Sequence, residues 1–428
     1  MISKGVVEID PELPEIELRD SLLQDYIDVI GRLSKTNVAN DLWWATDMAS
    51  KNRFVSPFPV LLGDFVQSML AIEQCESTHP CLHVTGASWP LIAGIQAYAE
   101  SKGIEVRVLT FPGARLCYRL KGKVRVWGGL FKSALLAVLN IFKAHRAFPP
   151  DSQSIGRNNP VYLVKSFVYP ASFGENGCYH DPFFGDLPTI LQRQLGDAVQ
   201  LVTMSLGFTD KYHCYQSMKQ LTDRVVVPLE AYLRLRDVVR ALVNISRHLL
   251  FHPFRLPDAI PFQDADLVPL LQESLAADGG SIQFFQYLHY YAARRFARQY
   301  DVSACLLTYE GNPWERMYIR GLREVCPGVL VIGYQHSVVP QAAAGMFLSE
   351  SELGLVPHPD RIVTTGEKTA DILKKYSAFP HERIYAGCAL RYAYLYDLAV
   401  LPRRCDADDR FVVLVALEGV MEVADLLS

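Results

Sequence analysis

The sequence lacks an excess of charge of either sign. Its 428 residues hold 42 Lys and Arg against 46 Asp and Glu, a net charge of −4. A protein that neutralises many phosphates over its whole surface would be strongly basic, so this balance argues against nucleic acid as a partner. The composition is that of a globular protein, and the length suits two or three domains.

Paired cysteine motifs are missing too. The nine cysteines are spread over the chain, and no two of them have the C-x-x-C spacing of structural zinc sites or thioredoxin-like centres. Several lie in apolar runs, as Cys305 does. This favours buried free thiols in a reducing cytoplasm over a disulfide framework.

No long uninterrupted apolar run is found. Residues 1–20 are acidic and lack the basic-then-apolar pattern of a secretory signal. The most membrane-like stretch, residues 129–142, is interrupted by Lys132 and Asn140 and is shorter than the ~20 apolar residues of a spanning helix. We therefore expect a cytoplasmic protein, either soluble or in peripheral contact with the inner face of a membrane.

Three diagnostic catalytic motifs are absent: the Walker A loop, the H-E-x-x-H zinc motif and the G-x-S-x-G nucleophile. Asp264-Ala265-Asp266 has the D-x-D spelling of metal-dependent sugar transfer. It precedes a helix rather than ending a strand, however, so we interpret it as a helix cap. We expect no metal and no resident cofactor.

What the chain does contain is a regular alternation of short apolar runs and helical patterns. The predicted strands are 81–85, 104–109, 161–167, 198–204, 224–227, 302–308, 329–334, 361–364 and 383–386. Continuous apolar strands between helices indicate a parallel sheet covered on both faces. The sequence therefore predicts an α/β fold with a Rossmann-like parallel sheet.

Helical regions and a polar linker divide the chain. Residues 1–80 are predicted to be mostly helical, and residues 81–400 to form the Rossmann-like domain, with a helical insertion at about 229–300. Residues 401–428 resemble a linker followed by one strand, 411–417, and a helix. Such a βα unit cannot bury both faces of its strand alone. It either completes the first sheet or opens a second, truncated Rossmann-like domain.

Polar side chains follow several predicted strands directly. In open α/β sheets, ligands bind at the carboxyl ends of the strands. The candidate site residues at these ends and in the helix that follows the first of them are Glu310, Asn312, Trp314, Arg316, Gln335, His336, Ser337 and Arg391.

The chemistry expected there is proton transfer. Glu310 or His336 would take a proton from a hydroxyl group, and the arginines would steady phosphate charge. Two alternatives stay open. Asn312 could simply cap the following helix in a box completed by Glu315, and His336 could be a loop histidine bound to backbone.

Two further patterns allow two interpretations each. The aromatic run 179–188 and the pair Trp43-Trp44 suit carbohydrate binding or plain packing. Basic faces on predicted helices suit an anionic membrane, a polyanionic acceptor or ordinary solvation. On the first predicted helix these basic residues are Lys132 and Lys143; Lys121, Lys123 and Arg125 are predicted to precede this helix and Arg146 to follow it. On the other two helices they are Arg236, Arg240 and Arg247, then Arg294, Arg295 and Arg298.

Five short motifs carry a family resemblance that spans roughly residue 40 to the end of the chain. They are Trp43-Trp44, Ser50-Lys51-Asn52, Phe184-Gly185-Asp186-Leu187-Pro188, Glu310-Gly311-Asn312-Pro313-Trp314-Glu315 and Gln335-His336-Ser337. Together they resemble a family of bacterial surface carbohydrate biosynthesis proteins that is similar to the GT-B glycosyltransferases.

The resemblance implies a function in building a cell-surface polysaccharide. A sugar would pass from a nucleotide-activated donor to a glycan or a lipid-linked acceptor, without a metal ion. The GT-B plan has two Rossmann-like domains facing a cleft, which places Glu310 and His336 on cleft-facing edges of the first domain. A non-catalytic glycan-binding or assembly scaffold protein, and more remotely an acyl- or phosphotransferase, remain alternatives.

Overall fold

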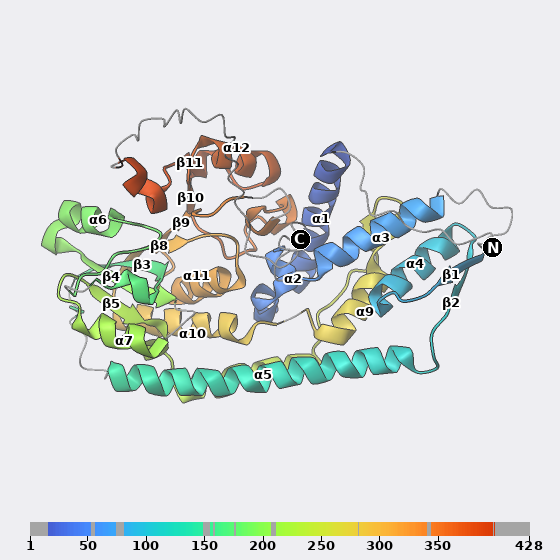
Figure 1. Ribbon diagram of the computed structural model, residues 1–428, viewed down its shortest axis with the longest axis horizontal. Helices are drawn as coiled ribbons and strands as arrows, with labels where there is room; N and C mark the ends of the chain where they lie inside the picture. The colour runs from blue at the N-terminus through green and yellow to red at the C-terminus, as the bar shows by residue number, and fades with distance from the viewer. Residues whose placement is uncertain are drawn as a thin grey trace, which may run out of the picture. The chain divides into compact units, whose positions relative to one another are not determined.

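Figure 1 shows the computed structural model of the chain. It describes residues 16–52, 56–73, 81–148, 155–156, 159–174, 177–206, 211–280, 282–339, 344–396 and 398. The chain divides into two units, Met1–Arg391 and Tyr392–Ser428, and the features below belong to the first. The predicted linker, strand 411–417 and final helix lie outside the described residues.

A seven-stranded parallel sheet forms the centre of the first unit. Its strands lie in the order β11 (Ile384–Ala386), β10 (Arg361–Thr364), β9 (Leu330–Tyr334), β8 (Val302–Thr308), β3 (Val161–Phe167), β4 (Gln200–Leu206) and β5 (Val225–Pro228). The sheet grows outward from β3 in one direction and from β8 in the other, as in a Rossmann-like fold. The predictions for these seven strands are confirmed to within two residues.

Helices flank this sheet. α6 (Leu187–Leu195) contacts β4, α7 (Lys211–Gln220) contacts β5, and α12 (Glu367–Tyr376) contacts β10 and β11. α11 (Pro313–Val325) follows β8 and packs on α10 (Phe284–Gln299). The strands are apolar and largely buried because helices cover them, which is typical of parallel sheets.

Most of the remaining helices lie in the N-terminal region and in the stretch predicted as a helical insertion. They are α1 (Ile16–Asn37), α2 (Asp47–Ser50), α3 (Phe58–Glu73), α4 (Trp89–Ser101), α8 (Leu235–Phe251) and α9 (Val268–Asp278). A small antiparallel hairpin, β6 (Pro261–Phe262) and β7 (Ala265–Asp266), precedes α9. There the Asp266 carboxylate accepts the N–H groups of Ile260 and Val268. The N-cap of α9 is Leu267, without a side-chain cap bond, and Asp266 ends β7, so the expectation that this segment does not end a strand was wrong.

The first two predicted strands do not join the main sheet. β1 (Cys81–Val84) and β2 (Glu105–Val108) pair only with each other, in a separate two-stranded parallel sheet. The α4 helix between them packs on α3 and α9 rather than on the seven-stranded sheet. β2 alternates exposed and half-buried residues, unlike a strand covered on both faces. The expectation of one continuous sheet from residue 81 was therefore wrong.

The apolar stretch 129–142 is part of a much longer helix than expected. α5 (Ala114–Ala147) is continuous over 34 residues and packs along α7, α8, α9 and α10 (Figure 1). Among the described helices it is the one long and apolar enough to cross a membrane, yet only 22% of its most apolar window is buried. The basic residues predicted to precede the helix lie within it.

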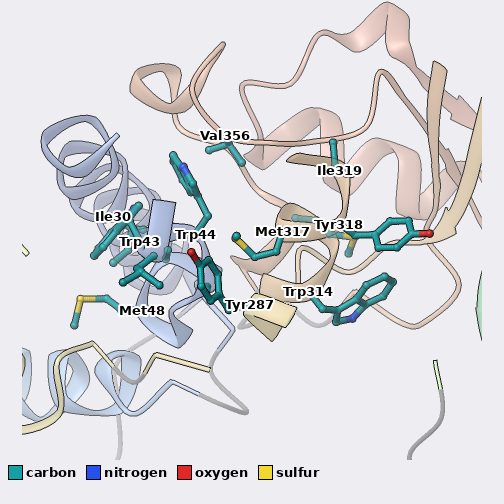
Figure 2. Packing of buried hydrophobic residues seen from close by; sticks show 14 of the residues in the cluster. Ile30, Trp43, Trp44, Met48, Tyr287, Trp314, Met317, Tyr318, Ile319 and Val356 are labelled. Atoms are coloured by element: carbon teal, nitrogen blue, oxygen red, sulfur yellow. The ribbon is translucent and has the colours of Figure 1, made fainter. Parts of the chain in front are cut away.

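The paired tryptophans of the sequence are core residues. Trp43 and Trp44 have no exposed surface, and Figure 2 shows them in one cluster with Met317 and Tyr318 of α11. The Trp43 indole also donates a hydrogen bond to the Ser34 hydroxyl at 3.0 Å. Packing, not carbohydrate binding, explains this pair.

Candidate functional site

The candidate site lies where the sheet reverses its direction of growth, between β3 and β8. In a sheet of this topology, this switch point is where a crevice opens at the carboxyl ends of the strands. Tyr169 follows β3, Glu310 follows β8, and His336 follows the neighbouring strand β9. Polar groups from segments far apart in the chain thus meet at one edge.

A carboxylate and an imidazole face each other at this edge. The Glu310 Oε1 atom lies 3.6 Å from His336 Nε2, and the two side chains are 30% and 6% exposed. The amide of Asn312 donates to Glu310 Oε2 at 3.1 Å. The hydrogen bond from Asn312 therefore holds the Oε2 atom of Glu310, while the Oε1 atom faces the imidazole of His336.

The ring of His336 is buried among aromatic rings, which disfavours its charged form. It packs against Phe183, with ring centres 4.4 Å apart, and against Phe167 at 6.1 Å. Neither ring nitrogen has a hydrogen-bond partner among the described residues. Burial lowers the pKa of His336; the Glu310 carboxylate opposes this shift, and the Arg391 guanidinium adds to it. A neutral imidazole of this kind can accept a proton.

The loop that presents Glu310 is shaped by the start of α11. Asn312 stands at the N-cap, and the buried Glu315 carboxylate accepts the N–H groups of Glu310, Gly311 and Asn312 at 2.8–3.2 Å. Burial, and then the Glu310 charge, raises the pKa of Glu315 well above its usual range. The capping function predicted for Glu315 is confirmed, and it also sets the position of Glu310.

Gly311 is required by a close backbone approach in the same loop. Its φ is +78°, and a Cβ atom there would lie 1.9 Å from the carbonyl oxygen of Gly345. A Cβ on Gly345 would in turn lie 2.6 Å from the carbonyl oxygen of Glu310. Only glycine at both positions lets the two backbones pack in this way.

Gln335 joins two strand ends and has no surface left for a ligand. Its side chain is fully buried, and its Oε1 atom accepts hydrogen bonds from the backbone N–H and hydroxyl of Thr365, at 3.1 and 3.2 Å. Its amide donates to the carbonyl of Ser337, which is half-buried. Gln335 thus positions the loop that carries His336.

Arg391 lies at the open side of the site. Its exposed guanidinium stands over the Phe183 ring, 5.3 Å from the ring centre. Its charge lowers the pKa of His336 and opposes the rise that burial causes in the pKa of Tyr169. A cation at this point can meet an anionic ligand approaching the imidazole.

Trp314 and Arg316 lie behind the site, inside the core. Trp314 is 3% exposed and packs edge-on against Phe167. Arg316 is 2% exposed, and its Nη1 atom donates to the carbonyl of Ala49. Among the described residues its Nη2 atom has no hydrogen-bond partner. In this geometry neither side chain reaches the surface where a ligand would enter.

A buried ion pair anchors α2 close to the site. Lys51 Nζ lies 2.5 Å from Glu352 Oε2, and neither side chain has any exposed surface. Burial lowers the pKa of Lys51 to about 8. The next residue, Asn52, donates its amide to the Asn312 side chain at 3.5 Å, which connects α2 to the Glu310 loop.

Sequence reasoning missed the aromatic wall of the site. Phe167, Tyr169 and Phe183 surround His336 and Arg391, although only the aromatic run 179–188 gave any signal. Asp181 folds that run by accepting the N–H groups of Phe183 and Phe184, both at 2.9 Å. The run is therefore partly packing and partly a site wall.

Other predicted features have structural partners. On α10, Arg295 pairs with Asp237 and Arg294 with Glu324, so these two basic residues stabilise helix packing. Within the described ranges no group of His, Cys, Asp and Glu could hold a metal ion.

No protein-family model, no curated protein and no solved structure matches the chain.

Proposed function

We propose that this chain takes part in the biosynthesis of a surface polysaccharide as a glycosyltransferase. It would move a sugar from a nucleotide-activated donor to a hydroxyl group of a glycan or lipid-linked acceptor. We also propose that the seven-stranded sheet and its site form the first domain of a GT-B enzyme. The supporting observation is the Glu310–His336 pair at the switch point of the sheet, with the exposed Arg391 over the Phe183 ring that packs on His336.

The chemistry follows from the state of these groups. The neutral His336 Nε2 would accept the proton of the acceptor hydroxyl as that oxygen bonds to the anomeric carbon of the sugar. The bond from this carbon to the diphosphate oxygen breaks, and its electron pair leaves with the nucleoside diphosphate. Glu310, 3.6 Å away, would stabilise the imidazolium that forms, and Arg391 the leaving phosphate charge.

The eight candidate residues then separate by function. His336, Glu310 and Arg391 would act on the reactants, with Asn312 orienting Glu310. Ser337 follows His336 at the same edge. Gln335, Trp314 and Arg316 would act as positioning residues because their side chains are buried.

A non-catalytic glycan-binding protein is the second candidate, favoured by a different observation. Aromatic rings flanked by polar groups bind sugars by stacking and hydrogen bonding. Tyr169 is half-buried and lies beside the buried Phe183 ring, which packs on His336, so a sugar would contact Tyr169 and the exposed Arg391 first. Such a surface could hold a glycan without any bond being broken.

Calorimetric titration with UDP-, GDP- and dTDP-sugars tests the proposal, together with release of the free nucleoside diphosphate into water. We expect one nucleotide class to bind and to be released slowly. His336→Asn should keep donor binding but lower the release rate at least a hundredfold, since a general base contributes about 10²–10⁴. Arg391→Gln should weaken donor binding.

Matched controls are available in the same domain. His358 is a half-buried histidine with a lowered pKa, and Glu367 is a carboxylate in the first turn of α12. His358→Asn and Glu367→Gln should leave binding and release unchanged. If no donor binds while surface glycans do, the glycan-binding alternative replaces the enzyme.

A further inference from the structure

The long helix α5 carries an apolar stripe that the protein does not cover. Its buried face points inward through Leu130, Ala134, Ala137, Ile141, Ala144 and Ala147. A different face leaves large apolar side chains 47–72% exposed: Leu116, Leu120, Val124, Phe131, Leu135, Leu139 and Phe142. Spacings of three, four and seven residues keep these side chains on one line along the helix. The line extends over about 40 Å at the rise of an α-helix.

Positive charge runs along the edge of this stripe. The sequence of α5 contains eight Lys and Arg and no Asp or Glu. Arg115 and Arg119 pair with Glu273 on α9. The other six are exposed: Lys121, Lys123, Arg125, Lys132, Lys143 and Arg146. In a chain with a net charge of −4, this is a strong local concentration of one sign.

The adjacent helix α8 repeats the pattern on a smaller scale. Leu235, Val239 and Val243 follow one another at intervals of four residues and are 45–57% exposed. Arg236 and Arg240 lie beside them at the same interval. α8 packs on α5, so the two helices form a pair of similar composition.

We propose that α5 docks on a membrane that contains anionic lipids, with its apolar stripe in the headgroup region and its lysines and arginines on the lipid phosphates. Apolar residues beside a basic edge are the pattern of interfacial helices. This inference concerns where the protein acts and does not depend on sugar transfer.

The contacts of α5 favour docking over spanning. The helix packs along α7, α8, α9 and α10, and ion pairs hold its first turns to α9. Crossing a bilayer would break all these contacts and place charged side chains in hydrocarbon, where each is costly. Lying flat keeps the buried face in the protein and gives the exposed stripe a partner.

Vesicle flotation of the full chain tests the proposal. We expect binding to vesicles of phosphatidylcholine and phosphatidylglycerol in equal parts, and none to phosphatidylcholine alone. Charge reversal of Lys121, Arg125 and Lys132 to Glu should weaken binding by at least about a hundredfold, since each basic residue near an anionic surface contributes roughly fivefold. Phe131→Asp with Leu135→Asp should abolish it.

Matched variants at other exposed positions provide the controls. Reversal of Lys35, Arg193 and Lys368 to Glu removes the same charge elsewhere, and Val60→Asp with Ile190→Asp adds the same acids elsewhere. Both controls should bind like the unchanged chain, with unaltered circular dichroism.

Three outcomes would overturn the proposal. The first is equal binding to both kinds of vesicle, or to neither. The second is a dimer in light scattering that dissociates on Phe131→Asp with Leu135→Asp, because a second copy would then cover the stripe. The third is a cellular protein that alkaline carbonate does not release from membranes, which would make α5 a spanning helix.

Discussion

Two acid–base pairs lie near the Glu310 loop, and they are built differently. Lys51 and Glu352 are 2.5 Å apart, fully buried, and supported by the Ser34 hydroxyl and the Ser349 N–H. Glu310 and His336 are 3.6 Å apart, and Glu310 keeps 30% of its side chain exposed. The Lys51–Glu352 pair is fully buried and is called the closed pair below. The Glu310–His336 pair is partly exposed to solvent through Glu310 and is called the open pair.

The difference separates stability from chemistry. A fully buried pair has no access to a substrate, and each charge depends on the other because removing one leaves the other unpaired in a medium of low polarity. In the open pair, the buried His336 nitrogens have no hydrogen-bond partner among the described residues, and the Glu310 carboxylate beside them is the partly exposed group that an incoming hydroxyl would meet. We therefore expect variants of the first pair to change folding and variants of the second to change function.

Breaking the closed pair should have the largest effect. Lys51→Met leaves the Glu352 carboxylate buried without its cation, which should lower the free energy of unfolding by about 3–5 kcal/mol in a chemical denaturation experiment. Glu310→Gln in the open pair should cost less than about 1 kcal/mol. Adding Glu352→Leu to Lys51→Met should restore part of the lost free energy of unfolding. If the double variant lost as much as the two single variants together, the two buried charges would not depend on each other.

Disturbing the loop of the open pair should have an intermediate effect. Gly311→Ala places a methyl group against the Gly345 carbonyl at a positive φ, and should lower the free energy of unfolding by about 1–3 kcal/mol. The matched control is Gly366→Ala, at the end of β10, where no atom lies within 4 Å of the added methyl. Equal losses for the two variants in denaturant unfolding would rule out the close approach.

Changing the charges around His336 should have the smallest effect, but an informative one. In NMR titration of the imidazole, the unchanged protein should show a pKa below the ordinary 6.5. Arg391→Gln removes a repelling cation and should raise that pKa, whereas Glu310→Gln removes an attracting anion and should lower it further. Shifts of the same sign in both variants would show that the ring does not lie between these two charges.

The lowered pKa of His336 also makes the stability of the protein depend on pH. Because the folded pKa of His336 is depressed, the unfolded chain binds more protons between the folded value and 6.5. The contribution of this residue to stability is complete above pH 6.5 and declines as the pH falls through that window. His336→Asn should remove this part of the pH dependence of unfolding.

Local pattern was enough for the strands and for the helix cap. Strands β3, β8 and β10 match their predicted bounds, since apolar runs between turn residues need no knowledge of the fold. Asn312 and Glu315 are three residues apart, so their relation at the start of α11 could also be predicted. Because the carboxyl ends of parallel strands meet at one edge, the sequence also predicted that Glu310 and His336 lie close together.

Relations over long separations could not be predicted. The sequence by itself determined a parallel sheet, its neighbouring helices and the polar groups at its carboxyl edge, because each depends on residues a few positions apart. Only the tertiary structure decided that β1 and β2 leave the main sheet, that Phe183 closes over His336, that Arg316 turns inward, and that Lys51 meets Glu352. These features depend on which distant segments pack together in the core. The hydrophobic effect is non-directional, so a local sequence pattern does not specify the partner of a buried segment.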